Sequence, residues 1–201
     1  MDVVEFLINL RTVFQRFFYV NYKDNNKEYL RIRFYKEDAL SIESYFNQSE
    51  LVDYYILEPY FRENLRYKDI GIENFEQISL KDTNRILSFY NKSATDFFSL
   101  KEINTEILLC NTLTLIEEFK LSNEQVLKAF KRYKVGNCDR ERLKYITGVI
   151  RDRRIDFDEK IIQSNYDISN IEEVLSIIHM SNNRIMGVDI EKEREIYKYI
   201  Y

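Results

Sequence analysis

The sequence predicts an α+β protein, in which a short antiparallel sheet is covered by helices and the C-terminal half is helical. Two patterns carry this prediction. Apolar and polar residues alternate over short stretches near the N-terminus, and apolar residues recur at three- and four-residue spacing through most of the rest. With 201 residues the chain suits one domain, 1–201, whose mixed part (1–91) precedes a helical part (92–201).

A β-hairpin is the central feature expected in the mixed part. The polar cluster 23–27 (KDNNK) separates two stretches rich in aromatic and β-branched residues, a pattern typical of two antiparallel strands joined by a turn. Pro59 follows a further β-prone run, which it would end because proline cannot donate to a ladder. The expected elements are a helix at 3–17, strands at 18–22 and 28–35, a helix at 37–47 and a third strand at 51–57.

Helices are expected throughout the second part, with the boundary between the parts near residues 91–95. Ser122 with Gln125 and Ser169 with Glu172 each resemble a capping box, which marks a helix start. The polar stretch 181–187 (SNNRIMG) is expected to be a loop between the last two helices. The helices are predicted at 72–90, 100–119, 122–133, 140–149, 170–180 and 189–199.

Composition excludes several function classes. A net charge of −4 argues against broad nucleic-acid binding. Two isolated cysteines and a single histidine argue against a structural zinc site and fit a reducing cytoplasm. Neither a secretory signal nor a membrane-spanning run is visible, and motifs for nucleotide, metal or Ser/Cys catalysis are missing. We therefore expect a cytoplasmic protein without cofactor, metal, membrane or nucleic-acid partner.

The second predicted strand carries two arginines on one face. Strand alternation places Tyr29, Arg31 and Arg33 opposite Leu30 and Ile32. Guanidinium groups at i and i+2 lie about 7 Å apart, so they repel, and a bound carboxylate between them would relieve that cost. From the strand alone, a solvated face whose arginines pair with Asp or Glu across the sheet is the simpler interpretation.

Further candidate residues lie beyond the third predicted strand and near the C-terminus. Arg62, Arg66 and Tyr67 follow the strand, where binding loops are common, although a surface ion-pair loop is the alternative. His179 is the only histidine and lies beside the apolar stripe of its predicted helix, so it could equally be a core residue. Histidine is the side chain that titrates near neutral pH, so any acid or base of that type must be His179.

Four segments agree, in order, with the motifs of one family. Residues 17–22 (FFYVNY) and 29–34 (YLRIRF) are similar to an aromatic strand and to a HLRxRF strand. Residues 60–67 (YFRENLRY) are similar to a YxRE segment that leads to RYG, and residues 179–187 (HMSNNRIMG) match HMxxNRxxG. The chain thus resembles the glutamate-elimination domain of class I lantibiotic dehydratases, also described as the thiopeptide-type bacteriocin biosynthesis domain. It departs from the pattern at Asn21, Tyr29, Lys68 and Asp69.

The resemblance implies a stand-alone peptide-modifying lyase. It would eliminate glutamate from glutamylated Ser or Thr of a ribosomal precursor peptide, with leader and core, after a separate glutamylation protein has acted. The implied catalytic residues are Arg31, Arg33 and Arg62, which bind carboxylate and developing charge, and His179, which moves a proton. The implied substrate-binding residues are Tyr29, Arg66, Tyr67 and Arg184.

Two other functions stay open at this point. The same family contains cyclases that form the thiopeptide pyridine by a formal [4+2] reaction and release the leader peptide. A non-catalytic adaptor that binds the precursor peptide along a sheet edge is the other alternative. The enzymatic interpretations further predict one polar cleft that collects Arg31, Arg33, Arg62 and His179, with Tyr29 and Tyr67 at its rim.

Overall fold

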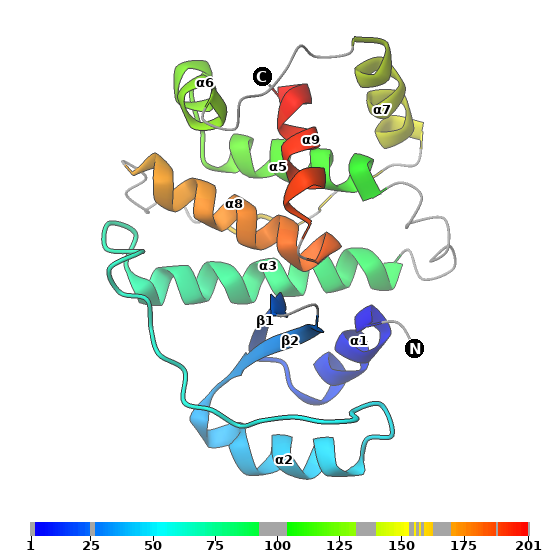
Figure 1. Cartoon of the computed structure of the whole chain (residues 1–201), viewed down its shortest axis with the longest axis vertical. Coiled ribbons are helices and arrows are strands. Elements are labelled where there is room, and N and C mark those ends of the chain that lie inside the picture. The colour runs from blue at the N-terminus through cyan, green and yellow to red at the C-terminus, as the bar shows by residue number, and fades with distance from the viewer. Residues whose placement is uncertain are drawn as a thin grey trace.

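The computed structural model describes residues 3–24, 27–92, 104–131, 140–152, 155, 157, 159–162, 170–187 and 189–200. Figure 1 shows a small sheet with two helices in one half and a group of helices in the other, which confirms the predicted α+β class. The elements are α1 (Val3–Val13), β1 (Phe17–Asp24), β2 (Lys27–Phe34), the 3-10 helix η1 (Lys36–Asp38), α2 (Ala39–Gln48), α3 (Ile72–Lys92), α5 (Asn104–Glu118), α6 (Asn123–Lys131), α7 (Arg140–Asp152), α8 (Ile171–Met186) and α9 (Ile190–Ile200).

The hairpin has the predicted faces. β1 and β2 pair antiparallel with Phe17 opposite Phe34 and Phe18 opposite Arg33. Leu30, Ile32 and Phe34 pack against the core that α1 and α2 share with the sheet. Because strand side chains alternate, Arg31 and Arg33 lie on the other face, and the predicted register is confirmed.

The predicted third strand at 51–57 is wrong. This segment is irregular coil, and among the described residues the sheet has two strands. Val52 and Tyr55 pack against the core near α2, where the Tyr55 hydroxyl donates to Asn47 Oδ1 at 2.7 Å. Tyr54 and Ile56 are exposed. An apolar run becomes a strand only when a neighbour takes up its backbone hydrogen bonds, and here side-chain anchoring to α2 holds the segment instead.

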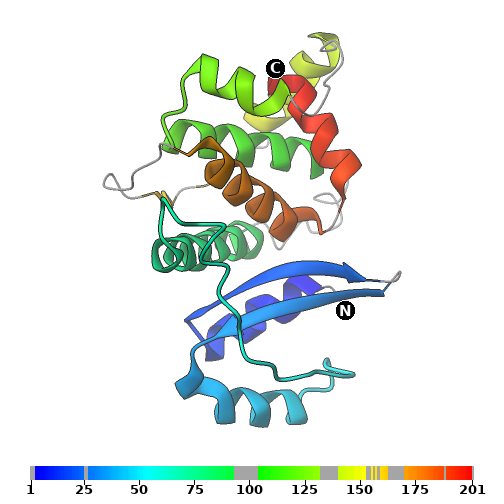
Figure 2. The ribbon, with the colours of Figure 1, turned by 60° about the vertical axis from the view of Figure 1, so that its left-hand side comes forward.

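Helix α3 lies between the two halves of the molecule. Figure 2 shows the sheet between α3 on one side and α2 on the other, with α5 and α8 beyond α3. Leu87 of α3 joins the core of the sheet half, whereas Ile86 and Phe89 join the core formed with α5, α7, α8 and α9. The first two residues of the boundary predicted at 91–95 are the last two residues of α3, and residues 93–95 lie outside the described residues.

Helix α8 is longer than predicted. It runs to Met186, so most of the stretch read as a loop, 181–187, is helical. Ser181, Asn182 and Asn183 are buried, and each finds a polar partner on another element. Tertiary hydrogen bonds therefore offset the poor helix propensity of this stretch. Gly187 ends the helix with a φ of +81°, which favours glycine.

Helix α1 is shorter than predicted, because it ends at Val13 and Phe17 already belongs to β1. In the described residues the other helices lie close to their predicted ranges. The capping box at Ser122 is confirmed, since its N–H donates to Gln125 Oε1 at 2.9 Å and its hydroxyl accepts from the Gln125 N–H at 3.3 Å. Ser169 lies outside the described residues, and Asn170 caps α8 by accepting from the Glu172 N–H. Within the described part of the chain, the helices lack the combination of length and apolarity needed to cross a membrane.

Candidate functional site

The outward face of the hairpin holds two arginines stacked on tyrosines. The guanidinium of Arg31 lies 3.6 Å from the Tyr22 ring centroid and 5.8 Å from that of Tyr29. Arg33 lies 4.8 Å from the Tyr60 ring, which the coil after α2 brings onto this face. A guanidinium stacked on a ring keeps its N–H edges free for an anion. We call this surface the arginine face.

Neither arginine of this face forms an ion pair with a carboxylate in the described part of the chain. Their cross-strand partners are apolar, with Val20 opposite Arg31 and Phe18 opposite Arg33. Partial burial lowers the pKa of the Arg33 guanidinium, and the neighbouring Arg31 charge adds to this effect. The solvated face paired with Asp or Glu, the simpler interpretation from sequence, is therefore not what forms.

Arg62 and Arg66, in contrast, are ion-paired. Arg62 is exposed and donates two hydrogen bonds to the Glu76 carboxylate of α3, from Nε at 2.9 Å and from Nη2 at 2.7 Å. Arg66 donates to Glu63 Oε2 at 3.0 Å. The ion-pair alternative thus describes both residues in this conformation. A substrate carboxylate would have to displace or share these partners.

Tyr60 and Glu63 connect the arginine face with the coil that leads into α3. The Tyr60 ring packs edge-on against Phe18 at 6.2 Å. Burial raises the pKa of its phenol, the Glu76 carboxylate adds to that, and the Arg33 charge opposes it. The negative charge of Glu63 opposes the lowering of the Arg33 pKa and helps to raise the Arg66 pKa. Tyr60 and Glu63 therefore link the two segments electrostatically, while the same coil also exposes the apolar Phe61 and Leu65.

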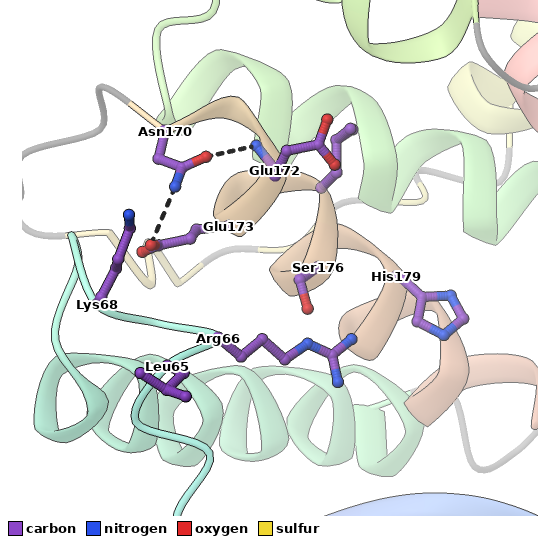
Figure 3. A pocket seen from close by; sticks show the side chains of 9 residues that line it. Leu65, Arg66, Lys68, Asn170, Glu172, Glu173, Ser176 and His179 are labelled. Carbon is purple, nitrogen blue, oxygen red and sulfur yellow. Dashed lines mark hydrogen bonds between the residues drawn. The ribbon is translucent and has the colours of Figure 1, made fainter.

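An open pocket of about 320 Å³ lies beside α8, and its volume is near the lower size limit of ligand sites. Figure 3 shows Arg66 reaching from the coil along α8 toward Ser176 and His179. We call this the His179 pocket. Its lining residues are Leu65, Arg66, Lys68, Asn170, Glu172, Glu173, Leu175, Ser176 and His179.

The pocket joins His179 to Arg66, whereas Arg31, Arg33 and Arg62 are not among its lining residues. The prediction of a single cleft is therefore wrong for the described residues: Arg31 and Arg33 lie on the arginine face, and His179 lines a separate pocket. Tyr29 lies on the arginine face, partly exposed, with its ring 5.1 Å from Tyr22.

His179 has a partner that sequence reasoning missed. Its side chain is 39% exposed, and Nδ1 lies 2.7 Å from Oε2 of Glu193 on α9. The buried Glu193 also accepts a hydrogen bond from Tyr197. The only signal in the sequence is that Glu193 precedes Ile196 and Tyr197 by a helical turn, which places a carboxylate on the buried face of α9.

Tyr67 and Arg184 are buried. Tyr67 stacks on Phe75 with ring centroids 3.7 Å apart, and its hydroxyl lies 3.0 Å from the Ser176 Oγ below the pocket. Arg184 binds Asp82 at 2.8 Å and donates from Nε to the Tyr19 carbonyl at 2.8 Å. Arg184 thus fastens α8 to β1 and α3 in this conformation.

A comparison with protein families gives a match over almost the whole chain. The family model described as "Lantibiotic biosynthesis dehydratase C-term" matches residues 2–201. The chain belongs to this family. Comparisons with curated proteins and with solved structures give no match.

Membership in the lantibiotic dehydratase C-terminal family confirms the resemblance found in the sequence motifs. It gives the chain a role in lantibiotic biosynthesis, as part of the machinery that modifies a ribosomal precursor peptide.

Proposed function

We propose that this protein is a lyase that removes glutamate from glutamylated Ser or Thr residues of a precursor peptide. The observation that carries the proposal is the arginine face, where Arg31 and Arg33 lie side by side without a carboxylate partner in the described residues. A glutamyl group offers the carboxylate that would complete such a site. A separate glutamylation protein would supply the substrate.

The elimination we propose needs one base and one anion site. The base removes the α-proton of the glutamylated residue, and negative charge develops toward the peptide carbonyl. As the Cα–Cβ double bond forms, the bond from Cβ to the ester oxygen breaks, and glutamate leaves with the bonding electrons as a free carboxylate. Cations preorganised next to that charge lower the barrier.

The residues divide between these tasks. His179 is the proposed base, since it is partly exposed and lines the pocket. Arg31 and Arg33 bind the glutamyl carboxylate, with Tyr29 beside them. Arg62 and Arg66 would reach the peptide by exchanging Glu76 and Glu63 for substrate. Tyr67 and Arg184 are buried, so we propose that they do not contact the substrate directly. Tyr67 would instead support the pocket, and Arg184 would hold α8 in place.

The direct test is incubation of the purified protein with a synthetic peptide that carries one O-glutamyl serine. Elimination converts that residue to dehydroalanine, and mass spectrometry detects the peptide that has lost glutamate. An unchanged peptide after long incubation with folded protein would argue against the lyase and leave the adaptor open.

A substitution at Arg33 tests the carboxylate site. Arg33→Lys keeps the charge but loses the planar fork, so we expect a higher KM for the glutamylated peptide and a loss of about 10-fold or more in kcat/KM, the value of one charge-assisted hydrogen bond. Arg16→Lys is the matched control, because Arg16 also stacks on a tyrosine, Tyr35, but already has a carboxylate partner in Glu37. Equal kinetics for the two variants would remove Arg33 from the site.

A further inference from the structure

The contact between α8 and α9 places a carboxylate behind the single histidine. His179 projects from α8, and Glu193 comes from the first turn of α9, the helix that follows Gly187. Oε2 of Glu193 lies 2.7 Å from Nδ1 of His179. Glu193 is 5% exposed, whereas the histidine side chain is 39% exposed. The carboxylate is thus on the inner side of the imidazole, and the pocket is on its outer side.

The geometry decides which ring nitrogen carries the proton. An ionised carboxylate only accepts hydrogen bonds, so the nitrogen that faces Glu193 must donate. In the neutral ring the proton then lies on Nδ1, and the lone pair is on Nε2. Within the described residues, Nε2 has no hydrogen-bond partner. The ring is therefore oriented with its basic nitrogen available to a ligand.

The carboxylate itself is held in place. The Tyr197 hydroxyl donates to Oε1 of Glu193, one turn further along α9. Tyr197 is buried and packs against Phe130 of α6 with ring centroids 4.4 Å apart. Fixed on both oxygens, Glu193 cannot swing away from the imidazole without breaking a buried hydrogen bond.

We propose that Glu193 is a positioning residue for His179, and that Tyr197 holds Glu193 in turn. Glu193 keeps the proton on Nδ1, presents Nε2 to the His179 pocket, and faces the positive charge that the imidazole acquires when it takes a proton. The part of this inference that concerns catalysis rests on the proposed elimination. The orientation of the ring does not, because it follows from the contacts alone.

The orientation can be measured directly, because the chain contains one histidine. A sample labelled with ¹⁵N-histidine gives the signals of His179 alone, and the shifts of the neutral ring report which nitrogen is protonated. We expect the Nδ1–H form in the wild type. In Glu193→Gln the amide oxygen is a weaker acceptor and the amide nitrogen can donate to the ring, so the Nε2–H form should gain population.

Kinetics with the O-glutamyl serine peptide test the catalytic consequence. Glu193→Gln should lower kcat by on the order of 10²-fold and leave KM unchanged, because the carboxylate does not touch the peptide. Tyr197→Phe keeps both the carboxylate and the packing on Phe130, so it should change spectrum and kcat in the same direction but less. Glu191→Gln is the matched control, since Glu191 is an exposed residue of α9 that pairs with Arg194 at 2.8 Å.

The outcomes separate this inference from the proposed function. A shifted spectrum with a lower kcat and an unchanged KM supports both. If the spectrum is shifted in Glu193→Gln but neither the wild type nor this variant releases glutamate, the ring orientation is supported and the elimination is contradicted. Spectra and kcat like those of Glu191→Gln overturn the inference while the elimination stands. The inference is also overturned by a combination of two results. Glu193→Gln loses activity only in proportion to the protein that has unfolded, and Tyr197→Phe gives the wild-type spectrum.

Discussion

Replacing His179 with Phe is expected to lower the rate of glutamate elimination by about 10²–10⁴-fold, the usual cost of removing a general acid or base. Phe keeps a planar ring at this partly exposed position but cannot accept a proton. Glutamylated peptide should therefore accumulate, as measured by mass spectrometry. The effect should lie in kcat, because the arginine face, which we propose as the carboxylate site, is unchanged.

A second variant at the same position separates proton transfer from the contact with α9. In His179→Asn the side-chain amide can still donate to Glu193, but no basic nitrogen is left. We expect it to be as inactive as His179→Phe while melting close to the wild type. Wild-type turnover in either variant would show that His179 is not the base.

Replacing Asp82 with Ala is expected to cost about 3–5 kcal/mol of unfolding free energy, the typical result of breaking a buried ion pair. Asp82 of α3 is fully buried, and it binds Arg85 and Arg184 at 2.8 Å and the Ser181 Oγ at 2.9 Å. Its loss leaves Arg184 as a buried cation without an acidic partner in the described residues. Against a total stability of about 5–15 kcal/mol, this change would leave the protein marginal.

Urea unfolding followed by circular dichroism measures this loss. Glu73→Ala on the same helix is the control, because Glu73 is exposed and lies 3.9 Å from Arg62. Its unfolding midpoint should stay near that of the wild type. If Asp82→Ala also unfolds at the wild-type midpoint, the buried charges do not hold α8 against α3 in the way described here.

Local patterns predicted the parts of the fold whose partners are near in sequence. The hairpin and its faces followed from the alternation of Leu30, Arg31, Ile32 and Arg33, because a strand pair joined by a short turn needs no distant information. The 51–57 segment failed for the opposite reason. Its composition favours a strand, but the segment is held by a hydrogen bond from Tyr55 to Asn47 of α2. The spacing of apolar residues along the sequence does not indicate such a contact.

Distant partners also explain what was missed at the end of the chain. Ser181 and Asn182 were predicted to be loop residues, yet they are buried in a helix. Asp82 accepts a hydrogen bond from Ser181, and Asn111 donates hydrogen bonds to Ser181 and Asn182. Such partners lie about 70 to 100 positions away in sequence. The candidate site residues came from strand alternation, from the loop after the third predicted strand, from the single histidine and from the family motifs. Glu193 was overlooked because it belongs to none of these.

Offering the purified protein two substrates separately tests the central claim most directly. One is a peptide with an O-glutamyl serine, and the other is a linear peptide that already carries dehydroalanines behind a leader. The account predicts that the first releases one glutamate for each dehydroalanine formed and that the second is returned unchanged. Macrocycle formation from the second with release of its leader, and no glutamate from the first, would contradict the account and identify a cyclase.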